Sequence, residues 1–278
     1  MIRNMLILMD GTPKAEGLLD CSLRLFRSEE NHYQGAFVEG ISTRNLNQVF
    51  DTPELIANQY TRSEIIEKIL HANIENSTEF IERFIHKCDE LELKTKVYLS
   101  PQDVDLNLIN QSIYSDLFLV GKEIFTKENI DKYSFSTIKA LLRNTRCPVL
   151  LLSCEVEKFN NIVLLFDGSK RSFEAIKLFM YLMADQVAEN RILLNVVVTE
   201  ESSGQEKHVI DYLKNYKQHF SIHRVYPENY YRELLTLLAG LEGFLLVSGV
   251  NKDEIIDDML LNKQGSFFMS PNRSVFLG

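Results

Sequence analysis

The 278-residue chain lacks the features that mark several large classes of protein. Its four cysteines are few for the length and none has CxxC spacing, so we expect reduced thiols and a cytoplasmic location. It has no dense run of lysine or arginine, and a formal net charge of −9 gives no long-range attraction to nucleic acid. The most apolar stretch, residues 234–250, is interrupted by Gly240, Glu242 and Gly243, which argues against a membrane span. We therefore expect neither a nucleic-acid nor a membrane partner.

Motifs of catalysis and metal binding are also missing. The chain contains no Walker A, G-x-G-x-x-G or G-x-S-x-G motif. His219 and His223 are four residues apart, but the predicted helix ends between them and no third ligand is nearby, so a zinc site is not favoured. Cys147 precedes a proline at the start of a predicted strand, where a buried structural thiol is expected rather than a nucleophile. We therefore assign no catalytic residue and no metal ligand, and we do not expect an enzyme.

What the chain does contain is an internal repeat. The segments NMLILMDGTPKAEGLLDCSLRLF, from residue 4, and NIVLLFDGSKRSFEAIKLFMYLM, from residue 161, share one pattern. Each has a short apolar run, then Asp-Gly-Thr or Asp-Gly-Ser, then apolar residues at helical spacing. The side-chain oxygens after such a strand can cap the free N–H groups at the start of the following helix.

The same alternation of strand and helix continues through both halves. Near-continuous apolar strands separated by amphipathic helices indicate a parallel sheet that is covered on both faces. We predict an α/β protein of two tandem, doubly wound domains, each with a five-stranded parallel sheet, at residues 1–154 and 159–278. The first contains a helical insertion at about 42–80. Residues 42–60 of it have no counterpart in the second half and lead into a long helix from about Ser63 to Leu91. The insertion is either a lengthened surface helix or a lid or docking element, and both interpretations stay open.

Several segments resemble the universal stress protein family. ILMDGT and LLFDGS resemble its first strand and turn, and DLFLVGK followed by STIKALLRNTRCPVLLLS resembles its fourth strand, last helix and last strand. The ending SPNRSVFLG is a weaker version of the same pattern. The resemblance covers nearly the whole chain as a tandem pair, and it implies an adenine nucleotide alpha hydrolase-like fold for each half. One subclass of this family binds ATP and another does not.

The resemblance also implies where a nucleotide would bind. In the ATP-binding subclass, the aspartate that ends the first strand lies near adenine and ribose, and a residue at the end of the second strand flanks the adenine. By similarity, these positions are Asp10, Gly11 and Val38 in the first half, and Asp167, Gly168 and Val197 in the second. In a parallel α/β sheet such residues meet at the carboxyl ends of the strands, where ligands bind.

The phosphate loop of that subclass, Gly-x-x-Gly followed after nine residues by Gly-Ser or Gly-Thr, is incomplete in the first half. Its glycines let backbone N–H groups face the phosphates. The first half keeps Gly121, but Ile124 and Ser134 occupy the other two glycine positions. A β-branched isoleucine is strained at positive φ, so we expect this loop to have another shape.

The second half departs from the same pattern in a different way. It keeps Gly249, but Lys252 replaces the next glycine, and the pair Gly265-Ser266 comes three residues late. The retained aspartates then serve to cap helices, and the retained glycines serve to turn the chain. We therefore expect no cofactor. ATP with magnesium, bound in the first half, is the alternative.

Each half ends in an apolar strand, at 149–152 and 275–277, and exposed apolar edge strands invite pairing. In single-domain relatives these last strands pair across a dimer, so the resemblance implies an intramolecular pseudo-dimer in which the two strands run side by side. A further homodimer through residues 42–91 stays open. The resemblance implies a non-catalytic cytoplasmic stress-response or signalling module that acts through an unidentified protein partner. The alternatives are an ATP- or ADP-binding member with weak or no hydrolysis, and a binder of another small metabolite in the same cleft.

Overall fold

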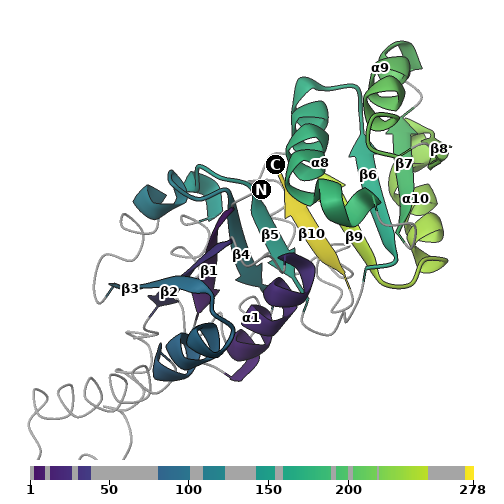
Figure 1. Cartoon of the computed structure of the whole chain (residues 1–278). Coiled ribbons are helices and arrows are strands. Elements are labelled where there is room, and N and C mark those ends of the chain that lie inside the picture. Colours follow the sequence, from purple (N-terminus) through teal and green to yellow (C-terminus); the bar gives the residue numbers. More distant parts are fainter. Residues whose placement is uncertain are drawn as a thin grey trace, which may run out of the picture. The chain divides into compact units, whose positions relative to one another are not determined.

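The computed structural model describes residues 3–9, 13–26, 31–38, 81–100, 109–122, 142–153, 159–188, 192–199, 203–217, 219–249 and 273–278. The chain divides into two compact units, Met1–Arg146 and Cys147–Gly278 (Figure 1). This division follows contacts rather than the sequence repeat, so the strand at 149–152 lies in the second unit. The domain bounds 1–154 and 159–278 stay a prediction, and the insertion at 42–80 lies outside the described residues.

The first unit is built on parallel strands with helices in the connections. Its strands are β1 (Asn4–Met9), β2 (His32–Val38), β3 (Lys94–Ser100) and β4 (Leu117–Gly121), and helix α1 (Pro13–Phe26) joins β1 to β2. The strands lie in the order β3-β2-β1-β4, and each neighbouring pair is parallel. Residues 81–90, the part of the predicted long helix that is described, are helical.

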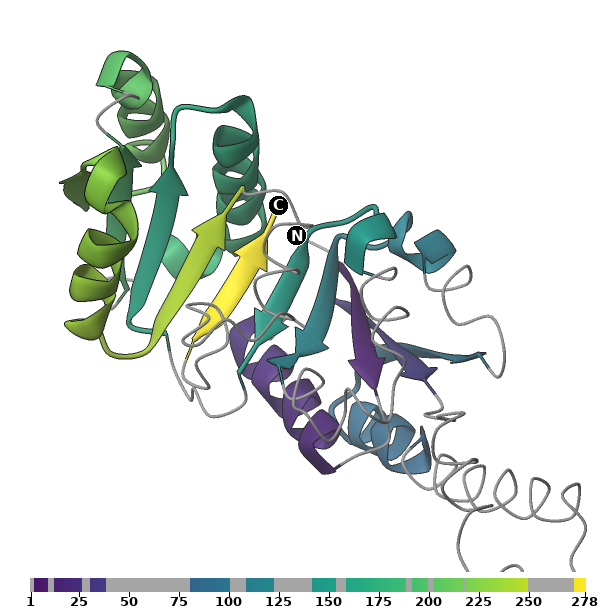
Figure 2. The same cartoon turned by 180° about the vertical axis from the view of Figure 1, so that it is seen from behind.

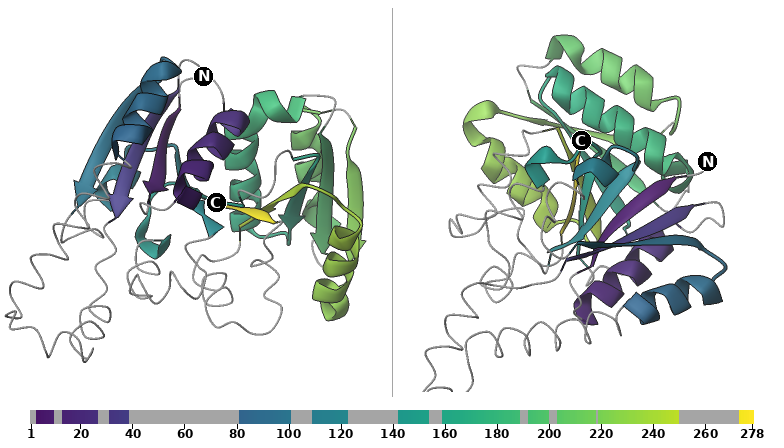
Figure 3. Two further views of the ribbon diagram at one scale, coloured as in Figure 1. Left: turned by 90° about the horizontal axis from the view of Figure 1, so that it is seen from below. Right: turned by 90° about the vertical axis from the view of Figure 1, so that its left-hand side faces the viewer.

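The second unit repeats this arrangement and extends it. Its elements are, in chain order, β5 (Val149–Leu152), β6 (Asn161–Phe166), α8 (Lys170–Ala188), β7 (Leu193–Thr199), α9 (Ser203–Leu213), β8 (Ser221–Val225), η3 (Pro227–Asn229), α10 (Tyr230–Ala239), β9 (Phe244–Ser248) and β10 (Ser274–Leu277). The strand order is β5-β10-β9-β6-β7-β8. Helices α8 and α9 cover one face of this sheet and α10 covers the other (Figure 3).

The two units share one topology. The order β3-β2-β1-β4 in the first corresponds to β8-β7-β6-β9 in the second. The repeat seen in the sequence is therefore matched by a repeat of strand order. Strands β4 and β6 are buried at nearly every position, as expected for parallel strands covered on both faces. The predicted α/β fold class is confirmed.

Strand β5 is the antiparallel member of the second unit. It pairs with β10 in the register Val275↔Leu151, Phe276↔Leu150 and Leu277↔Val149. Both strands are buried along their whole length, and the Ser153 amide donates a hydrogen bond of 3.0 Å to Ser274 Oγ. Figure 2 shows β5 beside the yellow strand β10 from behind. The edge of β10 is therefore covered.

Helix α9 is shorter than the sequence pattern predicts. The pattern indicates a helix through residues 206–220, whereas α9 ends at Leu213 and a turn follows at 214–216. His219 then precedes β8 and His223 lies within it, so the two histidines do not share a helix. Among the helices that the structure describes, none combines the length and the apolar character needed to cross a membrane.

Candidate functional site

The predicted site residues that the structure describes lie at the carboxyl ends of strands. In the first unit Val38 ends β2 and Gly121 ends β4. In the second unit Asp167 and Gly168 follow β6, Val197 lies buried in β7, and Gly249 follows β9. Since β6, β7 and β9 are parallel, these last four positions share one edge of the sheet. Asp10, Gly11, Gly265 and Ser266 lie outside the described residues.

The Asp167-Gly168-Ser169 turn starts helix α8. The Ser169 amide donates a hydrogen bond of 2.8 Å to Asp167 Oδ1, and the Ser172 amide donates one of 3.1 Å to Ser169 Oγ. Ser169 thus caps the first turn of the helix. Gly168 has φ 83°, in the left-handed region that side chains other than glycine rarely adopt. Asp167, Gly168 and Ser169 together start α8, so their presence is explained without a ligand.

The same hydrogen bonds determine the charge of Asp167. Burial alone would raise the pKa of this carboxyl group, but hydrogen bonds with Ser172 and Ser169 outweigh it and hold the pKa below its ordinary value. Asp167 is therefore a carboxylate at neutral pH. It can accept a hydrogen bond from a hydroxyl group.

Gly249 is packed directly against the backbone at the start of α8. A Cβ atom at this position would lie 2.4 Å from the Arg171 carbonyl oxygen and 2.5 Å from Ser172 Cα. Backbone atoms cannot yield to such an overlap as the end of a flexible side chain can. The glycine is thus required by the fit between the end of β9 and its neighbouring helix, whether or not a ligand is present.

The corresponding position of the first unit has a lysine beside it. Gly121 is half-buried at the end of β4, and Lys122 after it is buried and interacts with another group of the chain. The rest of the predicted phosphate loop, including Ile124 and Ser134, lies outside the described residues. Lys252 of the second half also lies outside the described residues.

Metal chemistry finds no support in the described part of the chain. No group of three or more His, Cys, Asp or Glu residues there could hold a metal ion. His223 Nε2 lies 3.1 Å from Asn195 Oδ1, so this imidazole is engaged within the sheet. Cys147 is buried and is not part of a disulfide, in agreement with the sequence-based interpretation.

The structure also contains a pocket that the sequence reasoning missed. It has a volume of about 490 Å³ and lies in the second unit, lined by the outer face of α8, the end of α9 and Gly278. A signal was present in the sequence, because Leu178 and Tyr181 interrupt the otherwise charged outer face of α8. The predicted functional positions lie at the ends of strands, and none lies on this face of α8.

Comparison with known proteins identifies the fold. No protein-family model matches the chain, and no curated protein matches its sequence. The crystal structure of a universal stress protein from Archaeoglobus fulgidus DSM 4304 is similar, with a TM-score of 0.62 over 99% of this chain and 95% of that chain, at 14% sequence identity. The chain therefore has a fold like that of universal stress proteins. At this level of identity the similarity extends to the fold alone.

Proposed function

We propose that this protein is a non-catalytic, tandem member of the universal stress protein type, which acts in the cytoplasm in stress response or signalling through a protein partner. The fold similarity supports the choice of family. The packing of Gly249 is the main support for the proposal that ATP is not the ligand. Its contact with the backbone of Arg171 and Ser172 accounts for the retained glycine without a bound phosphate. The loops that would bind phosphate have lost most of their glycines.

The hydrogen bonds of Asp167 support the same proposal. Its carboxylate accepts hydrogen bonds at the start of α8, which gives the retained aspartate a structural role without a ligand. The first unit, with Asp10 and Gly121, is the alternative place for a nucleotide, because its loop keeps the expected spacing and more lysine.

Thermal unfolding with millimolar Mg-ATP, Mg-ADP or AMP tests the proposal. We expect no shift in the unfolding midpoint. A nucleotide at a hundred times its dissociation constant would stabilise the protein by about 2.7 kcal/mol, which is readily measured. A shift that Gly121→Asp abolishes would contradict the proposal and place the nucleotide in the first unit, and Gly204→Asp, on α9, is the matched control.

We also propose that the β5–β10 pair is the link between the two sequence halves. β5 belongs to the first repeat in sequence, and β10 ends the second, so their antiparallel pairing would relate the repeats by a pseudo-twofold axis. Fusion of two copies keeps the two strands at high effective concentration. Disulfide cross-linking of a Leu150→Cys, Phe276→Cys pair should be intramolecular, and exclusive formation of cross-linked dimers would contradict the pairing.

A further inference from the structure

The pocket on the second unit has the size and position of an independent ligand site. Its volume of about 490 Å³ falls within the range of about 300–1,000 Å³ that is usual for small-molecule sites. It lies on the outer side of α8, whereas residues such as Phe179 and Met180 point from the other side of this helix into the core.

One wall of the pocket is aromatic and rigid. The rings of Tyr212 and Tyr216 have centroids 5.4 Å apart, and their hydroxyl oxygens lie 3.1 Å from each other. Phe173, on α8, supports Tyr212 edge-on with a centroid distance of 5.5 Å. Aromatic pairs at these distances attract each other beyond the effect of area burial, so the wall is held in place before any ligand arrives.

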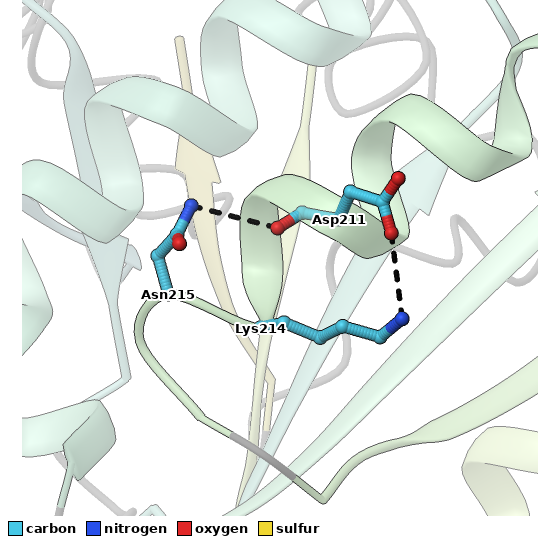
Figure 4. A network of polar contacts seen from close by, with 3 residues as sticks. All are labelled: Asp211, Lys214 and Asn215. Carbon is cyan, nitrogen blue, oxygen red and sulfur yellow. Dashed lines mark hydrogen bonds and ion pairs between the residues drawn. The ribbon is translucent and has the colours of Figure 1, made fainter.

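The turn after α9 fixes the positions of these two tyrosines. Lys214 Nζ lies 3.4 Å from Asp211 Oδ1, and Asn215 Nδ2 donates a hydrogen bond of 3.5 Å to the Asp211 carbonyl oxygen (Figure 4). The Tyr216 amide also donates to the Leu213 carbonyl oxygen at 2.9 Å. The chain therefore ends α9 in a closed turn, which presents both rings to α8.

The opposite wall leaves apolar surface exposed on a helix. Tyr181 is 56% exposed and Leu178 is 41% exposed, and both line the pocket. Single exposed apolar residues are ordinary, but here two of them lie together with Tyr212 and Tyr216 around one concave volume. A flat apolar ligand would remove this surface from water.

The pocket is lined by charged side chains of both signs. Two of them, Arg171 and Lys177, are cationic, and neither forms an ion pair with any residue in the described ranges. Glu174, the carboxylate beside them, is paired with Lys170 at 3.4 Å. Burial and the neighbouring Tyr216 hold the pKa of Tyr212 above its ordinary value, so this tyrosine adds no negative charge at neutral pH. An anionic group would therefore find two cations available.

We propose that this pocket binds a small, flat aromatic molecule that carries one anionic group. The ring lies against Tyr181, Tyr212 and Tyr216, and the anionic group lies beside Arg171 and Lys177. The aromatic walls supply affinity for any flat ring. The two cations favour a ligand that carries an anionic group over a neutral ligand of similar shape.

Isothermal titration of the full chain with 2-naphthoate, and with the neutral 2-naphthalenemethanol, tests the proposal. We expect naphthoate to bind about tenfold more tightly than the alcohol, because only the carboxylate pairs with the cations. Tyr181→Ala should weaken both ligands about tenfold. Tyr226→Ala removes a tyrosine of similar exposure, 50%, that does not line the pocket, and it should leave both affinities unchanged.

A second pair of variants tests the charge separately. Arg171→Gln should weaken naphthoate about tenfold and leave the neutral alcohol unchanged. Arg232→Gln, an exposed arginine on α10 away from the pocket, should change neither affinity. Equal binding of the two ligands, equal losses in Tyr181→Ala and Tyr226→Ala, or no naphthoate binding at millimolar concentration would each overturn the proposal. Far-UV circular dichroism confirms that each variant is folded.

Discussion

Gly249 shows at the scale of a single residue how a glycine can look like part of a ligand loop and yet have another cause. The sequence predicts only that the chain turns after β9. The structure adds the backbone of Arg171 and Ser172 at less than a normal contact distance from any added Cβ. That contact joins residues far apart in the chain, so no local pattern could have predicted it.

Gly249→Ala should therefore lower the free energy of unfolding by about 2 kcal/mol, within the range for an overpacked core. Gly204→Ala is the matched control, because nothing lies within 4 Å of its Cβ position on α9 and alanine favours the helix. Urea titration of both variants measures the two changes. A Gly249→Ala protein as stable as the wild type would show that this contact is not tight.

Asp167 makes a contribution to stability that depends on pH. Its pKa is below the ordinary value of 3.8 in the folded protein, so the contribution is fully present above that value and is lost as pH falls through the folded pKa. The contribution is at most about 1 kcal/mol, because the carboxylate is exposed and screened by solvent.

We expect the wild type to be more stable than Asp167→Asn at pH 7, and the difference to shrink as pH falls towards 3. Urea titrations at pH 7, 5 and 3 measure it. Glu228→Gln removes an exposed carboxylate that makes no hydrogen bond or ion pair within the described residues, so it should show no such trend. A constant difference across these pH values would contradict the prediction that the ionised form of Asp167 stabilises the folded protein.

At the scale of elements, an ion pair attaches α9 to the edge strand β8. Arg224 donates two hydrogen bonds to the carboxylate of Glu206, one of them 3.2 Å long from Nε. The Glu206 side chain is 10% exposed and that of Arg224 is 63% exposed. Loss of the arginine would therefore leave a buried carboxylate without its partner.

Arg224→Met should reduce the free energy of unfolding by about 1–3 kcal/mol, the usual cost of an unpartnered buried polar group. Arg232→Met removes an exposed arginine from α10 and should change stability by no more than about 0.5 kcal/mol. The double variant Glu206→Gln, Arg224→Met should recover part of the loss. Equal stability of the two single variants would contradict the role of the pair.

The elements were predicted with unequal success. Strands such as β6 and β9 are short and apolar, and polar residues or glycines bound them, so the sequence alone predicts where they lie. The end of α9 was not predicted, because Val209, Leu213 and Tyr216 continue a helical spacing. Tertiary contacts end the helix instead. Lys217 Nζ donates a 3.2 Å hydrogen bond to the Val187 carbonyl oxygen and another to that of Ile192, which holds the chain beside α8 and β7.

At the scale of the whole molecule, the sequence repeat predicted the topology but not the candidate ligand pocket. The topology follows from the alternation of strands and helices, which a single chain displays directly. The pocket depends on which face of α8 meets the end of α9, and this is a property of packing. The nucleotide positions were implied by the resemblance to a family, and four of them lie outside the described residues.

Two fragments test the importance of the β5–β10 pair. A fragment of residues 159–278 lacks β5 and exposes the apolar edge of β10, so we expect it to dimerise through that edge. A fragment of residues 147–278 retains β5 and should stay monomeric. Sedimentation equilibrium distinguishes the two, and Val275→Lys should suppress the dimer of the shorter fragment. If the shorter fragment is monomeric and as stable as the longer one, β5 is dispensable.

The pairing of β5 with β10 also imposes an order of events during synthesis. The ribosome releases residues 149–152 long before residues 274–277, and at about 5–20 residues per second the interval lasts several seconds or more. Throughout that interval the four apolar residues of β5 lack β10, the strand that covers one of their edges. A nascent chain stalled before its last few codons would therefore present an uncovered apolar edge, and we expect such a chain to bind chaperones that recognise emerging polypeptides.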